Sequence, residues 1–174
     1  MRHRVHRLQR PFYSKEFDSI RDQALFLPNI NLHPPSDSAI RIQAGFDILT
    51  RFVDVRMVSA LIEKDALQEA INYSGGVFRE LARIIRTAIG CARRRKADKI
   101  QLDDVEWAST EIRNEYRRIL DKEDLKLLKK VQETKRLEYN ERLKPLLQLL
   151  ALLEYRDEEN WCDVHPVIRK MLND

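Results

Sequence analysis

Three arginines follow a pair of glycines in the stretch SGGVFRELARIIR, which spans residues 74–86. Arg79, Arg83 and Arg86 are spaced i, i+4 and i+7, so their side chains share one face of a helix. A guanidinium group is permanently charged and can bind two oxygens of one phosphate or carboxylate. The spacing therefore predicts a helix with a strongly cationic face that is suited to anions.

The glycines in front of these arginines predict where that helix begins. Gly75 and Gly76 are adjacent, and glycine destabilises a helix interior, so the pair indicates a break between two helices. Apolar residues recur with helical spacing on the face opposite the arginines and predict a core stripe; they are Phe78, Leu81, Ile85 and Ala88.

The rest of the positive charge is unevenly distributed along a chain with a formal net charge of +4. A short run, Arg93, Arg94, Arg95 and Lys96, follows the predicted helix. Clustered arginine attracts nucleic-acid phosphates, but such runs are more often solvated loops. After Leu120 the chain carries eleven basic and twelve acidic side chains, and the loop DEEN at 157–160 would repel a phosphate backbone. Nucleic-acid binding is therefore not favoured.

Several kinds of site are excluded by what the 174 residues contain. The four glycines form neither a phosphate-binding loop nor a dinucleotide fingerprint, so no nucleotide-binding loop is expected on this chain. The two cysteines and four histidines lack the spacing of a metal site, and no nucleophile lies in a recognisable catalytic set. We expect no catalytic residues, no metal and no enzyme activity of the chain alone. No apolar run suits a membrane span or a signal peptide, which predicts a cytoplasmic protein.

The predicted elements are mainly helical and fall into three regions. Residues 1–35 contain a short helix capped by Ser14 and an apolar strand, QALFLPNINL (23–32), that lacks partners within the chain. We expect this region to be disordered, to pack on the helices or to pair with a second copy of the chain. Residues 36–120 carry four amphipathic helices, the first capped by Ser36 or Ser38. Their inward faces repeat with helical spacing, as in Ile42, Phe46, Leu49 and Val53, or Val105, Ala108, Ile112, Tyr116 and Ile119.

Residues 121–174 predict a hairpin as well as helices, unlike the all-helical pattern of residues 36–120. One helix is expected from about Asp121, and a second after Asn140 is either kinked by Pro145 or has that proline in its first turn. The stretch LLEYRDEENWCDVH (152–165) alternates around an acidic loop and predicts a two-strand hairpin. Pro166 is expected to begin a last short helix. Helices followed by a hairpin are typical of a winged helix, although the usual third helix of its core is hard to locate.

Taken together, SGGVFREL and the later KIQLDDVEWA (99–108) resemble the helical lid subdomain of AAA+ and STAND P-loop ATPases. In that lid a G-x-x-R motif at a helix start carries the sensor-2 arginine, and Gly76, Val77, Phe78 and Arg79 match it. The resemblance implies that Gly76 and Arg79 contribute to binding ATP. It also implies that residues 1–35 are the end of an ATPase core, 36–120 the lid and 121–174 a compact winged helix with a β-hairpin wing.

The Walker segments of the family are absent, so the resemblance implies ATP and magnesium only with a P-loop core, in the same parent chain or in trans. The chain would then be a non-catalytic portion of an ATPase that senses the bound nucleotide and relays the nucleotide state through protein contacts. A homo-oligomer of the chain is a further possible partner. The alternative is a stand-alone winged-helix DNA-binding regulator that anchors DNA through Arg83, Arg86 and the run 93–96. The two differ in DNA affinity, which should fall steeply with salt only for the regulator.

Overall fold

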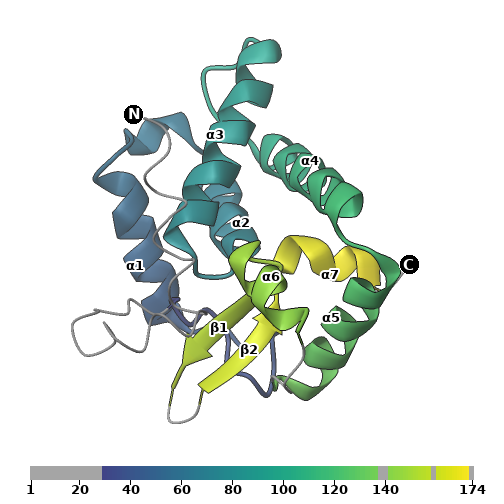
Figure 1. The fold of residues 1–174 in the computed structure, drawn as a ribbon. Helices are drawn as coiled ribbons and strands as arrows, with labels where there is room; N and C mark the ends of the chain where they lie inside the picture. Colours follow the sequence, from purple (N-terminus) through teal and green to yellow (C-terminus); the bar gives the residue numbers. More distant parts are fainter. Residues whose placement is uncertain (1–28, 137–140, 158–159, 173–174) are drawn as a thin grey trace, which may run out of the picture.

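Four helices form the first part of the fold in the computed structural model, which describes residues 29–136, 141–157 and 160–172. They are α1 (Gln43–Asp54), α2 (Lys64–Ser74), α3 (Phe78–Arg94) and α4 (Leu102–Ile119), with a short 3₁₀ helix, η5 (Ser59–Leu61), before α2. α2 contacts all three other helices, and α3 lies along α4 (Figure 1). Each helix buries one apolar face, as the periodicity predicts.

The second part contains three helices and a hairpin. Its elements are α5 (Lys122–Thr134), α6 (Leu143–Gln148), β1 (Leu152–Arg156), β2 (Asn160–Val164) and α7 (Pro166–Leu172). The strands are antiparallel, with Leu152 opposite Val164 and Arg156 opposite Asn160, which confirms the predicted hairpin. Pro145 lies in the first turn of α6, where its missing N–H removes no intrahelical hydrogen bond. The described residues thus form a mainly helical fold with seven α-helices and a C-terminal two-strand hairpin.

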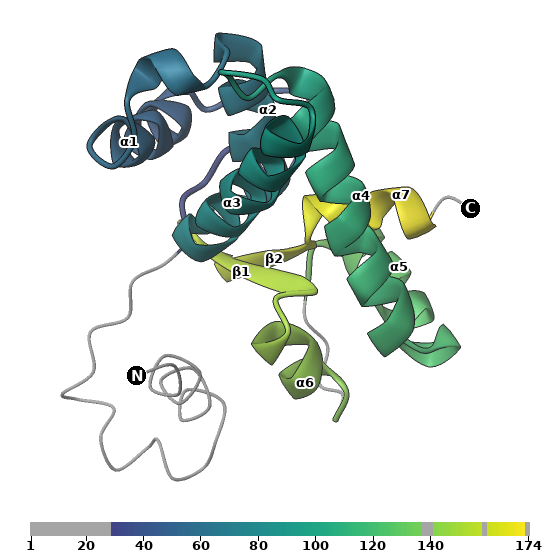
Figure 2. The ribbon, with the colours of Figure 1, turned by 90° about the horizontal axis from the view of Figure 1, so that it is seen from above.

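One apolar core joins the two parts. Its buried residues run from Leu32 to Leu172 and cross the boundary predicted near residue 120. α7 follows the hairpin and returns to pack against α2 and α4, as Figure 2 shows for α4. The C-terminal elements therefore pack directly on the four helices.

The predicted cap of the first helix is wrong. α1 begins at Gln43, after an extended Ile42 whose side chain makes no cap, and Ser36 and Ser38 lie well before it. The N–H of Ile42 instead donates to the carbonyl oxygen of Leu32. Packing of the preceding segment, rather than a side-chain cap, thus determines where α1 starts.

The predicted strand 23–32 is described only from Asn29, and the predicted helix after Ser14 lies outside the described residues. Residues 29–32 pair with no strand of the described chain. They pack on the helices and the hairpin, which is one of the three arrangements expected for residues 1–35. Leu32 is buried, and the amides of Asn29 and Asn31 donate to the carbonyl oxygens of Glu154 and Arg156, at 2.9 and 3.2 Å.

The core face of α4 is confirmed except at its last residue. Val105, Ala108, Ile112 and Tyr116 are buried, but the side chain of Ile119 is 55% exposed. The helix ends at Ile119, and the extended backbone of Leu120 directs the next apolar side chain inward instead. Within the described ranges, no helix has the length and apolar character needed to cross a bilayer.

Candidate functional site

The break predicted at the two glycines is a tight turn between α2 and α3. Gly75 adopts a left-handed conformation, with φ 59°, and ends α2, and Gly76 follows with φ 80°. The hydroxyl of Ser74 donates to the carbonyl oxygen of Ile71 and accepts a hydrogen bond from the N–H of Gly76 at 3.2 Å. These bonds hold the turn, so that α3 begins at Phe78, two residues after Gly76.

Gly76 is buried beneath the segment 29–32. The N–H of Ile30 donates to the carbonyl oxygen of Gly76 at 3.0 Å. A Cβ at Gly76 would overlap the carbonyl oxygen of Ile30, so only glycine fits. The structure therefore places Gly76 against the chain's own backbone, where it sets the direction of α3.

Arg79 is the second residue of α3, and its side chain is 40% exposed. Its Nε lies 3.7 Å from Oε1 of Glu80. Arg79 and Gly76 are thus near each other along the chain, but the glycine is covered while the arginine reaches the surface. Of the two residues predicted to contribute to ATP binding, Arg79 is the one whose side chain a ligand can contact.

Glu80, next to Arg79, is a charged residue that the sequence reasoning missed as part of a site. It is only 3% exposed, and its Oε2 accepts a hydrogen bond from Arg83 at 3.1 Å. Arg83 also contacts Glu115 on α4 at 2.6 Å. Burial alone would lower the pKa of Arg83, but the carboxylates of Glu80 and Glu115 raise it above its usual value. The i, i+3 spacing of Glu80 and Arg83 was the available signal.

His165 lies fully buried beside this pair. Its Nε2 is 3.7 Å from Oε2 of Glu80, and its Nδ1 accepts a hydrogen bond from the N–H of Val167. Burial lowers the pKa of His165 to about 3, and the nearby positive charges of Arg83 and Arg169 act in the same direction. The neutral ring also packs against Tyr116 of α4, with ring centroids 5.8 Å apart.

These contacts join the start of α3 to the C-terminal elements. Glu80 lies between Arg79, Arg83 and His165, and the hydroxyl of Tyr155 on β1 donates to the carbonyl oxygen of Gly75 at 2.7 Å. A displacement of the α2–α3 turn would therefore act directly on the hairpin and on α7.

Two of the remaining predicted cations have partners within the fold. Arg86 is exposed on α3, while Arg95 donates to both carboxylate oxygens of Asp104, at 3.2 and 2.6 Å. Arg94 lies over the ring of Trp107, with its guanidinium 4.0 Å from the centroid. Both arginines thus hold the start of α4 although they are exposed, as are Arg93 and Lys96.

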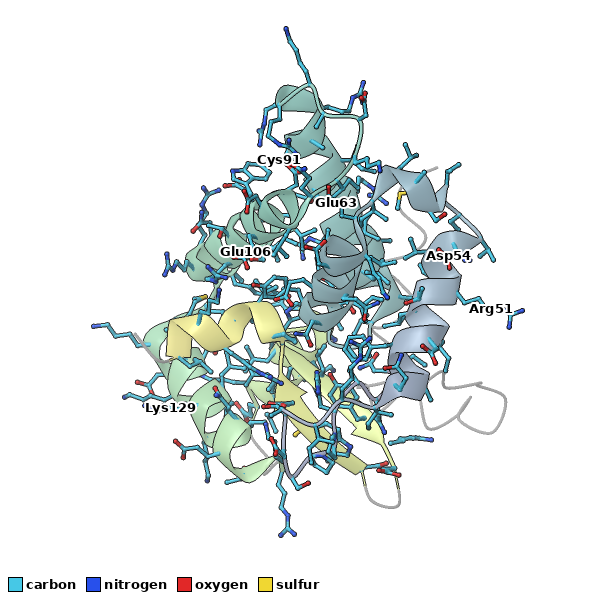
Figure 3. The ribbon with its side chains drawn as sticks, turned by 180° about the vertical axis from the view of Figure 1, so that it is seen from behind. Arg51, Asp54, Glu63, Cys91, Glu106 and Lys129 are labelled. Atoms are coloured by element: carbon cyan, nitrogen blue, oxygen red, sulfur yellow. The ribbon has the colours of Figure 1, made fainter. Side chains whose placement is uncertain are left out.

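Asp104 occupies the first turn of α4, where an acidic side chain interacts favourably with the positive end of the helix. Burial would raise the pKa of its carboxyl, but the bonds from Arg95 and from the N–H of Gln101 hold that pKa below its usual value. Cys91 lies on the neighbouring part of α3 (Figure 3), and burial raises the pKa of its thiol. This group therefore fixes the contact between α3 and α4 rather than forming a reactive centre.

Among the residues placed in the structure, no group of three or more histidine, cysteine or acidic side chains is arranged to hold a metal ion. Comparisons with protein-family models, with curated proteins and with solved structures found no match to this chain.

Proposed function

We propose that this chain is the non-catalytic lid and winged-helix portion of an AAA+ or STAND-like P-loop ATPase, which senses the nucleotide bound by the core. The observation that carries the proposal is the left-handed glycine pair directly before α3, with a half-exposed arginine as the second residue of that helix. This is the position at which the resemblance implies the sensor-2 arginine. A helix N-terminus adds a favourable field for a phosphate there.

The chemistry proposed for Arg79 is electrostatic. With a P-loop core bound, its guanidinium would contact the γ-phosphate of ATP and lose that contact after hydrolysis and phosphate release. The backbone of the α2–α3 turn and the Glu80 group would pass the resulting displacement to the hairpin and α7. Arg79 binds and orients, and no residue of this chain is assigned a proton-transfer or nucleophilic role.

Elements α5 to α7 with the hairpin are proposed to be the winged helix, with protein rather than DNA as its target. Two basic side chains here, Lys135 and Arg169, both contact the buried carboxylate of Asp163, at 2.7 Å each. Asp157 adds an exposed acidic side chain at the end of the hairpin. Phosphate backbones require accessible positive charge, so this surface supports protein contacts better.

Arg79→Ala tests the sensor role in a complex of this chain with its P-loop core. The variant should reduce ATP turnover at least about tenfold, since a charge-assisted hydrogen bond contributes about 1.5–3 kcal/mol and each 1.4 kcal/mol is a factor of ten. Its thermal melting should change little, because the side chain is largely on the surface. Steady-state ATP hydrolysis and circular dichroism give the two measurements.

The matched control is Arg86→Ala, which removes an exposed arginine from the same helix. Arg83 would be a poor control because its removal leaves the buried Glu80 without its closest cation. Turnover unchanged by Arg79→Ala, or reduced equally by Arg86→Ala, would contradict the sensor role. Calorimetric titration of the isolated chain should show no ATP binding tighter than about millimolar, because one such contact supplies too little free energy.

A further inference from the structure

A cavity of about 260 Å³ lies on the C-terminal side of the molecule, apart from Arg79. It is lined by the hairpin, α7, the end of α2, the end of α5 at Lys135 and the chain between Leu32 and Ser38. We call it the hairpin pocket. The sequence predicted no binding role for any residue in it, because its walls come from five separate parts of the chain.

The ionised side chains that line the hairpin pocket are predominantly cationic. Lys135, Arg169 and Lys170 line the pocket together with a single carboxylate, Asp163, which is almost completely buried. Lys135 Nζ and an Arg169 terminal nitrogen both contact the same oxygen of Asp163, Oδ2, at 2.7 Å each. One carboxylate thus neutralises only part of the positive charge, and Lys170 is exposed at the rim.

Two hydrogen-bond donors of the lining residues are buried without an acceptor. They are Nε of Arg169 and the indole Nε1 of Trp161. A buried donor with no partner is unfavourable, so such atoms commonly indicate a missing water or ligand. Both donors require an acceptor, and an oxyanion supplies several acceptor oxygens with the charge that the cations favour.

The other walls of the hairpin pocket are apolar and aromatic. Trp161 stacks on Tyr155 with ring centroids 4.4 Å apart, and Leu32, Pro34 and Tyr73 also line the space. The hydroxyl of Tyr155 is already bonded to Gly75, so this ring offers a surface rather than a polar group. A compact apolar or planar body would pack here while its anionic group meets the donors.

We propose that the hairpin pocket binds a small organic anion, a carboxylate or phosphate ester on a compact apolar body, through Arg169, Trp161 and Lys170. The proposal does not depend on the proposed function, because none of these residues takes part in the Arg79 site. A ligand here would bridge the hairpin, α7 and the end of α2, and so would stabilise the contact between the two parts of the fold.

The test uses the two indole N–H signals of the ¹⁵N-labelled chain, one from Trp107 and one from Trp161. Trp107→Phe assigns the two indole signals, because only the Trp161 signal remains in that variant. Titration with phenylacetate or with inorganic phosphate should shift the Trp161 signal along a saturable curve and leave Trp107 in place. Saturation by phenylacetate alone identifies a carboxylate on an apolar body, and saturation by phosphate alone identifies a phosphate group.

Neutral 2-phenylethanol and sodium chloride at matched ionic strength are the controls for shape and for charge screening. Arg169→Gln and Lys170→Gln should each weaken probe binding, the first by about tenfold or more, whereas Arg136→Gln, outside the hairpin pocket, should not. Lys170→Gln covers the case in which loss of Arg169 unfolds the protein. The proposal is overturned if neither anion saturates the Trp161 signal, or if sodium chloride or phenylethanol produces the same shift.

Discussion

Replacing Gly76 by alanine should lower the free energy of unfolding by about 2–5 kcal/mol, because two separate costs add. The residue has φ 80°, which an L side chain rarely adopts, and its Cβ would overlap the carbonyl oxygen of Ile30. Because the clash is with backbone, no side-chain rotation can relieve it. Urea denaturation followed by circular dichroism measures the change.

Gly90→Ala is the matched control for this prediction. Gly90 lies within α3, and a Cβ added there would meet no neighbouring atom. Alanine at this position should therefore raise the free energy of unfolding by roughly 0.5–1 kcal/mol through its higher helix propensity. The two substitutions are chemically identical and should differ in sign. A Gly76→Ala protein as stable as the wild type would show that the segment 29–32 does not press on the turn in solution.

Acidification should destabilise the protein from about pH 6.5 downward, and His165 should account for most of the effect between pH 6.5 and 5. Burial lowers the pKa of His165 to about 3 in the folded state, while the unfolded ring titrates near its usual value of about 6.5. Between these values the unfolded chain binds a proton that the folded chain does not. Stability therefore rises with pH there, by at most about 1.4 kcal/mol per unit.

The groups around His165 act on its protonation in opposite directions. Burial and the charges of Arg83 on α3 and Arg169 on α7 disfavour the charged ring, whereas Glu80 on α3, a carboxylate within 4 Å, favours it. Tyr116 on α4 contributes a ring face. The pKa values of Asp104 and Asp121 are also lowered, Asp104 by its bonds to Arg95 and Gln101 against the effect of burial, and Asp121 by its bonds to the Asp124 N–H and Arg142. Their contributions are lost only below about pH 4, outside the diagnostic window.

The measurement is the free energy of unfolding against pH for the wild type and for His165→Phe. The variant should lose most of the slope between pH 6.5 and 5, whatever its stability at neutral pH, and His33→Gln should keep most of it. An unchanged slope in His165→Phe would mean that another group carries the pH dependence.

The sequence predicted correctly the elements whose boundaries depend on residues that are adjacent in the sequence. The Gly75–Gly76 break was confirmed because a left-handed pair ends a helix whatever surrounds it. The hairpin was confirmed because alternation about Arg156 and Asn160 is visible within one short stretch. The core faces of α1 and α4 followed from helical spacing, apart from Ile42, which precedes α1 and is only half-buried, and Ile119.

The errors arose where distant parts of the chain meet. Ser36 and Ser38 were plausible caps, but the backbone bond from Ile42 to Leu32 sets the start of α1 instead. Glu80 was not singled out from the sequence, since nothing near it in sequence shows that His165 packs beside it. The hairpin pocket could not be predicted either, because the residues that line it are far apart in the sequence. The proposed ATP-sensing role of Arg79 and the division into three regions stay predictions.

The amide bonds from Asn29 and Asn31 to the hairpin have a consequence for how the chain is made. Their acceptors, the carbonyl groups of Glu154 and Arg156, each lie 125 residues later in the sequence. A ribosome must therefore synthesise 125 further residues before the segment that covers Gly76 gains these partners. α1 to α4 emerge earlier and can form their mutual contacts, but this closure has to wait for the hairpin to leave the exit tunnel.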